Sequence, residues 1–217
     1  MEYKFKVIVL GDFSSGKTSI VKRIKDDTFY NTYTSTIGVD FLKKRFDHED
    51  IFNDTLTLED ENACYEISKQ DRLEYFKPKD TRFKKYHACL DKAKRRDISY
   101  SLSLWDTSGQ EKFSNITLAY YRNISACIFV FDLTNYNSFK SIETWHSDLF
   151  SKINQETLDN KEFFPKIIVG NKTDLDKSRV VTKKECKELA SKLGCKYIEC
   201  SAKDNDNIKE IFAELIK

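Results

Sequence analysis

A run of eight residues near the start of the chain has the spacing of a phosphate-binding loop. It reads Gly11-Asp12-Phe13-Ser14-Ser15-Gly16-Lys17-Thr18, which satisfies G-x-x-x-x-G-K-[ST]. The backbone N–H groups of Ser14, Ser15 and Gly16 are expected to point at phosphate oxygens. Lys17 would bring a positive charge to the outer phosphates, and the Thr18 hydroxyl can ligate Mg²⁺. The alternative is a chance glycine turn, but the loop follows an apolar strand pattern and opens a helical one, which favours a nucleoside triphosphate site.

Two further motifs predict which base is bound. Asn171-Lys172-Thr173-Asp174 begins at the end of an apolar strand pattern, and Ser201-Ala202-Lys203 follows the next one. The Asp174 carboxylate can accept both donors on the Watson–Crick edge of guanine, a pair that adenine lacks. A site built to pair polar groups rejects the analogue without them by about 10⁴-fold. The motifs predict guanine-binding residues Asn171, Lys172, Asp174, Ser201, Ala202 and Lys203, whereas a surface turn or an ATP site would require both motifs to be accidental.

These motifs lie in loops between alternating strand and helix patterns. Such alternation predicts an α/β fold around a mainly parallel sheet, and the phosphate-loop motif after the first strand is typical of a P-loop NTPase. Continuous apolar runs at 126–131 and 166–170 are typical of parallel strands that are covered on both faces. Further strands are expected at 5–10, 40–46, 98–105 and 197–200, and helices at 16–25, 138–154, 183–193 and 208–215. Apolar stripes at helical spacing should face the core, such as Ile20, Val21 and Ile24 in the first helix and Phe139, Ile142, Trp145 and Leu149 in the second. Thr182 with Glu185 fits a capping box, and Gly194 stands where a helix should end.

Composition and charge exclude several classes of protein. No apolar run reaches the ~18 residues that a membrane span needs, and the N-terminus has no signal-peptide pattern, so we expect a soluble, cytoplasmic protein. The net charge of +2 is too small to imply a nucleic-acid partner. The six cysteines form no CxxC pair, which favours reduced, structural thiols over metal ligands or disulfides. They are Cys64, Cys89, Cys127, Cys186, Cys195 and Cys200.

The segment 47–97 interrupts the alternation of strands and helices. Residues 47–66 include eight acidic residues and no Lys or Arg, whereas residues 67–97 include eleven basic and five acidic ones. A hairpin of two ordinary strands spans at most about 25 residues, so this segment is an insertion. It can be a solvated loop, two halves of opposite charge folded on each other, or an arm that docks a partner. We favour a disordered or loosely structured excursion over a specific binding module.

With these motifs in place, the chain resembles the Ras superfamily of small GTPases, and the Rab branch most closely. The resemblance covers nearly everything outside the insertion and rests on four further blocks. They are Ser35-Thr36-Ile37-Gly38-Val39-Asp40-Phe41, Leu104-Trp105-Asp106-Thr107-Ser108-Gly109-Gln110-Glu111-Lys112-Phe113, Tyr120-Tyr121-Arg122, and Phe131-Asp132-Leu133-Thr134-Asn135 leading to Ser138-Phe139. It implies one Ras-like G domain over residues 1–217, with a mainly six-stranded, mixed but mostly parallel sheet and about five helices.

The resemblance also implies roles for individual residues. Thr36 resembles the threonine that ligates Mg²⁺ and meets the γ-phosphate, Asp106 the aspartate that reaches Mg²⁺ through water, and Gly109 the amide that senses the γ-phosphate. Gln110 resembles the glutamine that orients the attacking water, so the implied catalytic residues are Gln110, Lys17 and Thr36. Phe29 would pack against the guanine, with Lys172 over the ring face. Phe41, Trp105 and Tyr120 resemble the aromatic trio that contacts effectors, although each could simply be a core residue.

The function implied by the resemblance is a monomeric GTP/GDP switch that hydrolyses GTP slowly with Mg²⁺. Its partners would be an exchange factor, a GTPase-activating protein, and effectors that bind the GTP-bound state in vesicle traffic. The end at Lys217 has none of the C-terminal cysteines that Rab proteins use for prenylation, and we favour truncation over a protein that uses no such anchor. The full protein would then be peripheral on endomembranes, because only such a lipid anchor, not present in this sequence, would hold it there.

Two loop residues depart from the family pattern. Phe13 and Ser14 stand where Ras-like proteins usually have small residues, commonly glycine at the second position, and Ser108 replaces a common alanine. Phe13 would project near the γ-phosphate, where an activating protein inserts its catalytic side chain. We therefore expect slow intrinsic hydrolysis and altered activator sensitivity. The alternative function is a GTP-locked scaffold that hydrolyses little, for which Phe13 is the sequence argument.

Overall fold

The computed structural model of the chain describes residues 2–30, 39–48, 98–108, 120–153 and 164–216. These residues divide between two compact units, one formed by residues 4–44 and 101–217 and the other by residues 1–3 and 45–100. The strands are β1 (Glu2–Leu10), β2 (Val39–Asp47), β3 (Ser99–Thr107), β4 (Ala126–Asp132), β5 (Lys166–Asn171) and β6 (Lys196–Cys200). The helices are α1 (Lys17–Asp26), α6 (Tyr136–Lys152), α8 (Lys183–Leu193), α9 (Ile208–Ile216) and the 3₁₀ helix η3 (Thr173–Ser178).

The strands form one six-stranded sheet in the order β2-β3-β1-β4-β5-β6. Strand β4 runs parallel to β1 and to β5, and β5 runs parallel to β6, with Ile128 paired to Val9 and to Ile167. Every residue of β4 is buried, as the continuous apolar run of this segment predicts. The mostly parallel α/β sheet is therefore confirmed. Its parallel strands place the loops that follow β1, β4, β5 and β6 at one edge, where ligands bind in folds of this type.

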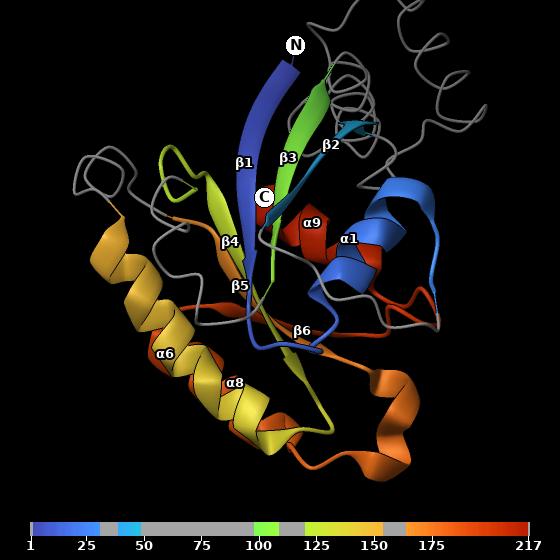
Figure 1. The fold of residues 1–217 in the computed structure, drawn as a ribbon, viewed down its shortest axis with the longest axis vertical. Coiled ribbons are helices and arrows are strands. Elements are labelled where there is room, and N and C mark those ends of the chain that lie inside the picture. The colour runs from blue at the N-terminus through green and yellow to red at the C-terminus, as the bar shows by residue number, and fades with distance from the viewer. Residues whose placement is uncertain (1, 31–38, 49–97, 109–119, 154–163, 217) are drawn as a thin grey trace, which may run out of the picture. The chain divides into compact units, whose positions relative to one another are not determined.

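Helices cover the sheet on both faces (Figure 1). Helices α6 and α8 lie on one face, where their apolar sides share a core cluster with β4; its members include Phe129, Phe131, Phe139, Ile142, Leu149, Cys186 and Leu189. Helices α1 and α9 lie on the other face and pack on each other. The apolar stripes predicted for these helices are buried as expected, among them Ile20, Val21 and Ile24 of α1.

The ends of the helices show which local signals the sequence carries. Thr182 and Glu185 form the predicted capping box, and Gly194 ends α8 with a left-handed φ of 60°. Helix α6 begins two residues earlier than the sequence predicts, because the Asn135 side chain accepts hydrogen bonds from the backbone N–H groups of Asn137 and Ser138. Among the described residues, Cys127, Cys186, Cys195 and Cys200 are free thiols, as expected.

In the smaller unit, Tyr100 is the centre of the described contacts. Its hydroxyl lies 2.9 Å from Nδ1 of His48, and its ring stacks on Tyr3 at a centroid distance of 6.1 Å. The expected insertion at 47–97 lies outside the described residues apart from its first two positions, as do Cys64 and Cys89.

Candidate nucleotide-binding site

A cavity of about 340 Å³ lies in the larger unit and has the size of a ligand site. It is lined by residues of the phosphate loop and α1, and by residues 28–30, 107–108, 171–172, 174–175 and 202–203. The structure thus brings most of the predicted nucleotide contacts to one place: Ser14, Gly16, Lys17, Thr18, Phe29, Asn171, Lys172, Asp174, Ala202 and Lys203. Thr36, Gly109 and Gln110 lie outside the described residues.

The two glycines of the phosphate loop are required by close contacts. A Cβ atom at Gly11 would lie 2.0 Å from the carbonyl oxygen of Val130, and one at Gly16 would lie 2.0 Å from Nδ2 of Asn171. Both glycines also have positive φ values, of 141° and 93°. Only glycine allows the loop to fold this closely against β4 and β5, and this packing brings the loop to the edge of the cavity.

Ser14 adopts a backbone conformation that favours glycine. Its φ of 63° lies in the left-handed region, where a side chain costs about 1 kcal/mol or more. This gives a physical reason for the sequence expectation that glycine is common at this position. The neighbouring Phe13 side chain is 43% exposed.

Lys17 supplies a buried positive charge. The residue is only 4% exposed, and its Nζ donates a hydrogen bond of 2.8 Å to the backbone oxygen of Asp12. Burial lowers the pKa of Lys17 to about 8, although the carboxylates of Asp106 and Asp12 oppose the shift. A buried ammonium group that has little contact with water is stabilised by a nearby anion. This environment fits the predicted phosphate ligand.

Thr18 and Asp106 form the predicted magnesium side of the site. The Thr18 hydroxyl donates to Oδ2 of Asp106 at 2.6 Å, while Oδ1 of this buried carboxylate has no hydrogen-bond partner among the described residues. Burial raises the pKa of Asp106 to about 6, whereas the bond from Thr18 and the charge of Lys17 lower it. A cation would compensate the unpaired oxygen, so these residues fit Mg²⁺.

The described residues contain no group of three or more His, Cys, Asp or Glu side chains that could hold a metal ion on its own. Protein sites usually hold Mg²⁺ by one or two side chains, with phosphates and water as the remaining ligands. Thr18 and Asp106 would supply the protein's share, together with Thr36 from outside the described residues.

Asp174 is oriented by the loop that follows β6. Its Oδ1 accepts a hydrogen bond of 2.8 Å from the Ser201 hydroxyl, and its Oδ2 lies 3.9 Å from Nζ of Lys203. Ser201 does not itself line the cavity, so it positions Asp174 instead. Ser15 does not line the cavity either, and its backbone N–H bonds to the oxygen of Asp12.

Asn171 joins the phosphate loop to the base-binding loop. Its Nδ2 donates to the oxygen of Ser15 at 3.0 Å, and its Oδ1 accepts from the backbone N–H of Ala202 at 3.2 Å and from the Cys200 thiol at 3.5 Å. The sequence predicts a base contact at this position but not this cross-link. The Asn171 side chain therefore links the phosphate loop to the loop after β6, and it also forms part of the cavity wall.

Replacing Asn171 by alanine is expected to destabilise the protein. The change leaves the Ser15 oxygen and the Ala202 N–H buried without partners, and each such loss costs about 1–3 kcal/mol. Urea unfolding should show a free energy of unfolding lower by about 2–6 kcal/mol. Asn137→Ala, at an exposed position of α6, is the matched control and should change stability little. Equal stability of the two variants would contradict the cross-link.

Several residues that the sequence did not single out hold the site together. The Asp132 carboxylate accepts a hydrogen bond of 2.6 Å from Nζ of Lys172, which orients the side chain expected over the guanine ring. Arg23 of α1 donates to the backbone oxygens of Ala202 and Lys203 at 2.7 and 2.6 Å. Asp132 could have been found from the sequence, because it lies at the carboxyl end of a buried strand, where site residues gather. No local sequence pattern predicts the hydrogen bonds of Arg23.

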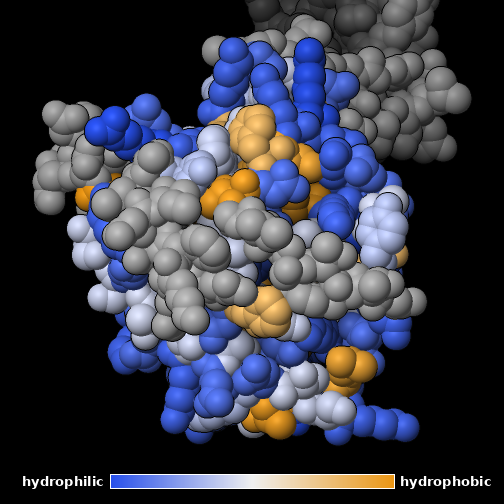
Figure 2. All heavy atoms as spheres, viewed as in Figure 1, coloured by the Kyte–Doolittle hydropathy of each residue, from blue (hydrophilic) through white to orange (hydrophobic). Residues whose placement is uncertain are grey.

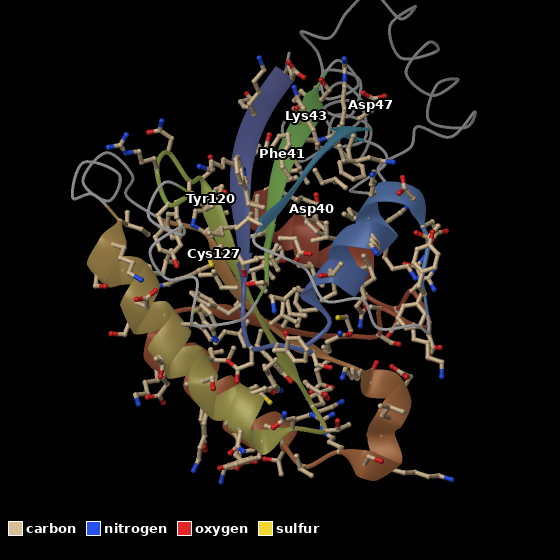
Figure 3. All side chains as sticks on the ribbon, in the orientation of Figure 1. Asp40, Phe41, Lys43, Asp47, Tyr120 and Cys127 are labelled. Atoms are coloured by element: carbon tan, nitrogen blue, oxygen red, sulfur yellow. The ribbon has the colours of Figure 1, made fainter. Side chains whose placement is uncertain are left out.

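The three aromatic residues expected to bind effectors are in contact. The ring centroid of Trp105 lies 4.9 Å from that of Phe41 and 5.0 Å from that of Tyr120. Phe41, labelled with Tyr120 in Figure 3, is 52% exposed, and Nζ of Lys6 lies 4.7 Å over the Trp105 ring. The face shown in Figure 2 carries a small apolar patch with hydrophilic residues above it and to its right. The trio is thus partly exposed rather than entirely core.

Comparisons with known proteins identify the family. A model of the Ras family matches residues 75–217, and a model described as the Ras of Complex, Roc, domain of DAPkinase matches residues 6–79. The chain is 31% identical to Ras-related protein Rab-3A of Homo sapiens over 215 residues, which covers 99% of this chain and 73% of the relative. The chain belongs to the Rab family of small GTPases. Ras-related protein Rab-3 of Caenorhabditis elegans is 32% identical over 216 residues, covering 100% and 74%.

Membership of the Rab family fixes the general activity. This Rab protein binds GTP and GDP with Mg²⁺, hydrolyses GTP, and works through exchange factors, activating proteins and effectors in vesicle transport. "GTP-binding protein Rab-3D" of Rattus norvegicus is a further relative, 31% identical over 215 residues, with 99% of this chain and 74% of the relative covered. Within the described part of the chain, no helix has the length and apolar character to cross a membrane.

Proposed function

We propose that this Rab protein is a GTP-driven switch whose cycle depends on the residues that meet at the 340 Å³ cavity. The observation that carries the proposal is the convergence of three groups on that cavity. Lys17 supplies the phosphate charge, the Thr18 hydroxyl bonded to Asp106 supplies the magnesium oxygens, and Asp174 supplies the acceptor for the guanine. Each group has the burial or the hydrogen bonds that its role requires.

The ground-state binding follows from these residues. Lys17 neutralises phosphate charge in a buried position, and the N-terminus of α1 adds backbone N–H groups to the same anion. Thr18 and Asp106 would hold Mg²⁺, which neutralises charge that develops on the phosphates. Phe29 and Lys172 enclose the base while Asp174 accepts its donors, so the cavity selects guanine nucleotides.

The switch itself involves residues outside the described part of the chain. Thr36 and Gly109 would contact the γ-phosphate and so order their two loops only in the GTP-bound state. Gln110 would orient the attacking water, with Lys17 stabilising charge on the phosphates. Effectors would then bind the aromatic trio Phe41, Trp105 and Tyr120 when these loops are ordered.

Single-turnover GTP hydrolysis with Mg²⁺ tests this proposal. The wild-type chain should hydrolyse GTP slowly, and Gln110→Leu should slow it further by about tenfold or more, because water positioning is lost. GTP affinity should remain unchanged, which separates catalysis from binding. If Gln110→Leu hydrolyses GTP at the wild-type rate, another residue positions the water.

Phe13 is expected to slow the wild-type rate. Its exposed side chain adjoins the strained Ser14 in the loop that would meet the γ-phosphate. The variant Phe13→Ser should therefore hydrolyse GTP severalfold faster in the same assay. Wild-type protein that binds GTP tightly but shows no hydrolysis, with no difference in either variant, would instead support a GTP-held scaffold.

We further propose that the protein acts as a monomer that moves between the cytoplasm and the surface of endomembranes. The support is membership of the Rab family, whose members use a C-terminal lipid anchor to reach membranes. The charged segment at 47–97 is proposed to be a loosely structured excursion within the single G domain of residues 1–217.

A further inference from the structure

The phosphate loop makes a long-range hydrogen bond to helix α6. Nε1 of Trp145 donates to Oδ1 of Asp12 at 2.8 Å, across a sequence separation of 133 residues. The sequence predicts Trp145 as part of the apolar stripe of α6, and its ring does pack against the core cluster. The hydrogen bond from the indole N–H to Asp12 is a second, polar contact of Trp145, and packing in the core does not require it.

The main chain of Asp12 supports the phosphate loop, whereas its side chain carries a charge that would repel a phosphate. Its backbone oxygen accepts hydrogen bonds from Nζ of Lys17 at 2.8 Å and from the N–H of Ser15 at 3.3 Å, so the main chain of Asp12 supports the loop. Its carboxylate, however, carries a negative charge within a loop that binds anions. The side chain must therefore be directed away from the ligand.

The direction of the Asp12 side chain agrees with this requirement. Ser14, Gly16 and Lys17 of the same loop line the cavity, but Asp12 does not. The donor that holds its carboxylate elsewhere is well fixed. Trp145 lies in the middle of a 17-residue helix and its ring packs against buried side chains, so the position of the N–H varies little. An indole N–H is a donor only, so it can bind a carboxylate oxygen but cannot accept from the loop.

We propose that Trp145 is a positioning residue for nucleotide binding, which holds the Asp12 carboxylate against α6 and out of the phosphate site. The inference rests on the proposed nucleotide site and adds a residue to it. Without the indole N–H, the carboxylate turns toward the ligand and repels it. GTP carries one more phosphate than GDP, so its binding is weakened more.

The test compares Trp145→Phe, Asp12→Asn and the double variant, using binding of a non-hydrolysable GTP analogue and of GDP with Mg²⁺. Trp145→Phe keeps an aromatic ring but removes the donor, and it should weaken the GTP analogue about tenfold, the scale of a hydrogen bond to a charged group. GDP should be weakened less. Asp12→Asn keeps an acceptor for the indole and removes the charge, so it should lose less affinity for the GTP analogue than Trp145→Phe does.

The double variant distinguishes charge from packing. It has no carboxylate to place, so it should recover the affinity that Trp145→Phe loses. A double variant as weak as Trp145→Phe, or an unchanged affinity in Trp145→Phe, would overturn the inference. An equal loss for GTP and GDP would also overturn it, because lost packing would affect both alike. Wild-type protein that binds neither nucleotide would instead refute the proposed site itself.

Discussion

Replacing Asp174 by asparagine is expected to remove most of the preference of the protein for GTP over inosine triphosphate. Inosine lacks the 2-amino group of guanine and so offers one donor fewer to the Asp174 carboxylate. Asparagine has nearly the same size and can still accept the hydrogen bond from Ser201, but it presents an N–H group where the base needs an acceptor. GTP affinity should fall by about 10³-fold, since buried polar groups of the base are left unpaired.

Competition between the two nucleotides measures this effect directly. The ratio of GTP to inosine triphosphate affinity should be large for wild type and approach one for Asp174→Asn, because inosine triphosphate loses fewer contacts. Asp176→Asn is the matched control, since Asp176 lies in the same 3₁₀ helix but is exposed and does not line the cavity. A variant at Asp174 that kept the full preference for GTP would place base recognition elsewhere.

The position of the site was predictable because the motifs follow strands. The phosphate loop comes after β1, and the motifs at 171–174 and 201–203 come after β5 and β6. Parallel strands place these loops at one edge of the sheet, so motifs far apart in the sequence were expected to meet. The hydrophobic runs gave the strands, and this alternation was enough to predict the architecture.

The bonds between the loops were not predictable. Asn171 with Ser15, and Trp145 with Asp12, are separated by 156 and 133 residues, and no local pattern states which side chains will face each other. Such pairs depend on the register of the strands and the rotation of α6. Helical spacing placed Trp145 correctly on the apolar side, but it cannot show that the indole N–H has a polar partner.

The catalytic half of the prediction rests on other grounds. Thr36, Gly109 and Gln110 were assigned from their places in motif blocks, and they lie outside the described residues. Their roles remain predictions that hydrolysis assays must test. The binding half has contacts that support it, because Lys17 is buried and oriented by the Asp12 oxygen, and Oδ1 of the buried Asp106 carboxylate has no partner among the described residues.

The other large effect is expected at Lys17. Replacing it by alanine should lower the affinity for both GTP and GDP by about 10³-fold, because removal of one partner of a buried charge pair costs several kcal/mol. The loss should exceed that at any exposed cation near the cavity, since Lys17 is only 4% exposed and water screens its charge poorly.

Lys22 provides the control for general charge effects. It lies on the same helix and also lines the cavity, but it is less buried and its Nζ lies 5.2 Å over the ring of Tyr30. Lys22→Ala removes the same formal charge from a less buried position. The affinity for fluorescent GDP, measured by equilibrium binding, should therefore fall only slightly. If both variants lost affinity equally, the phosphates would be attracted by the summed positive charge of the site and not by one direct contact. A large loss in Lys17→Ala alone means that the buried ammonium contacts the nucleotide directly.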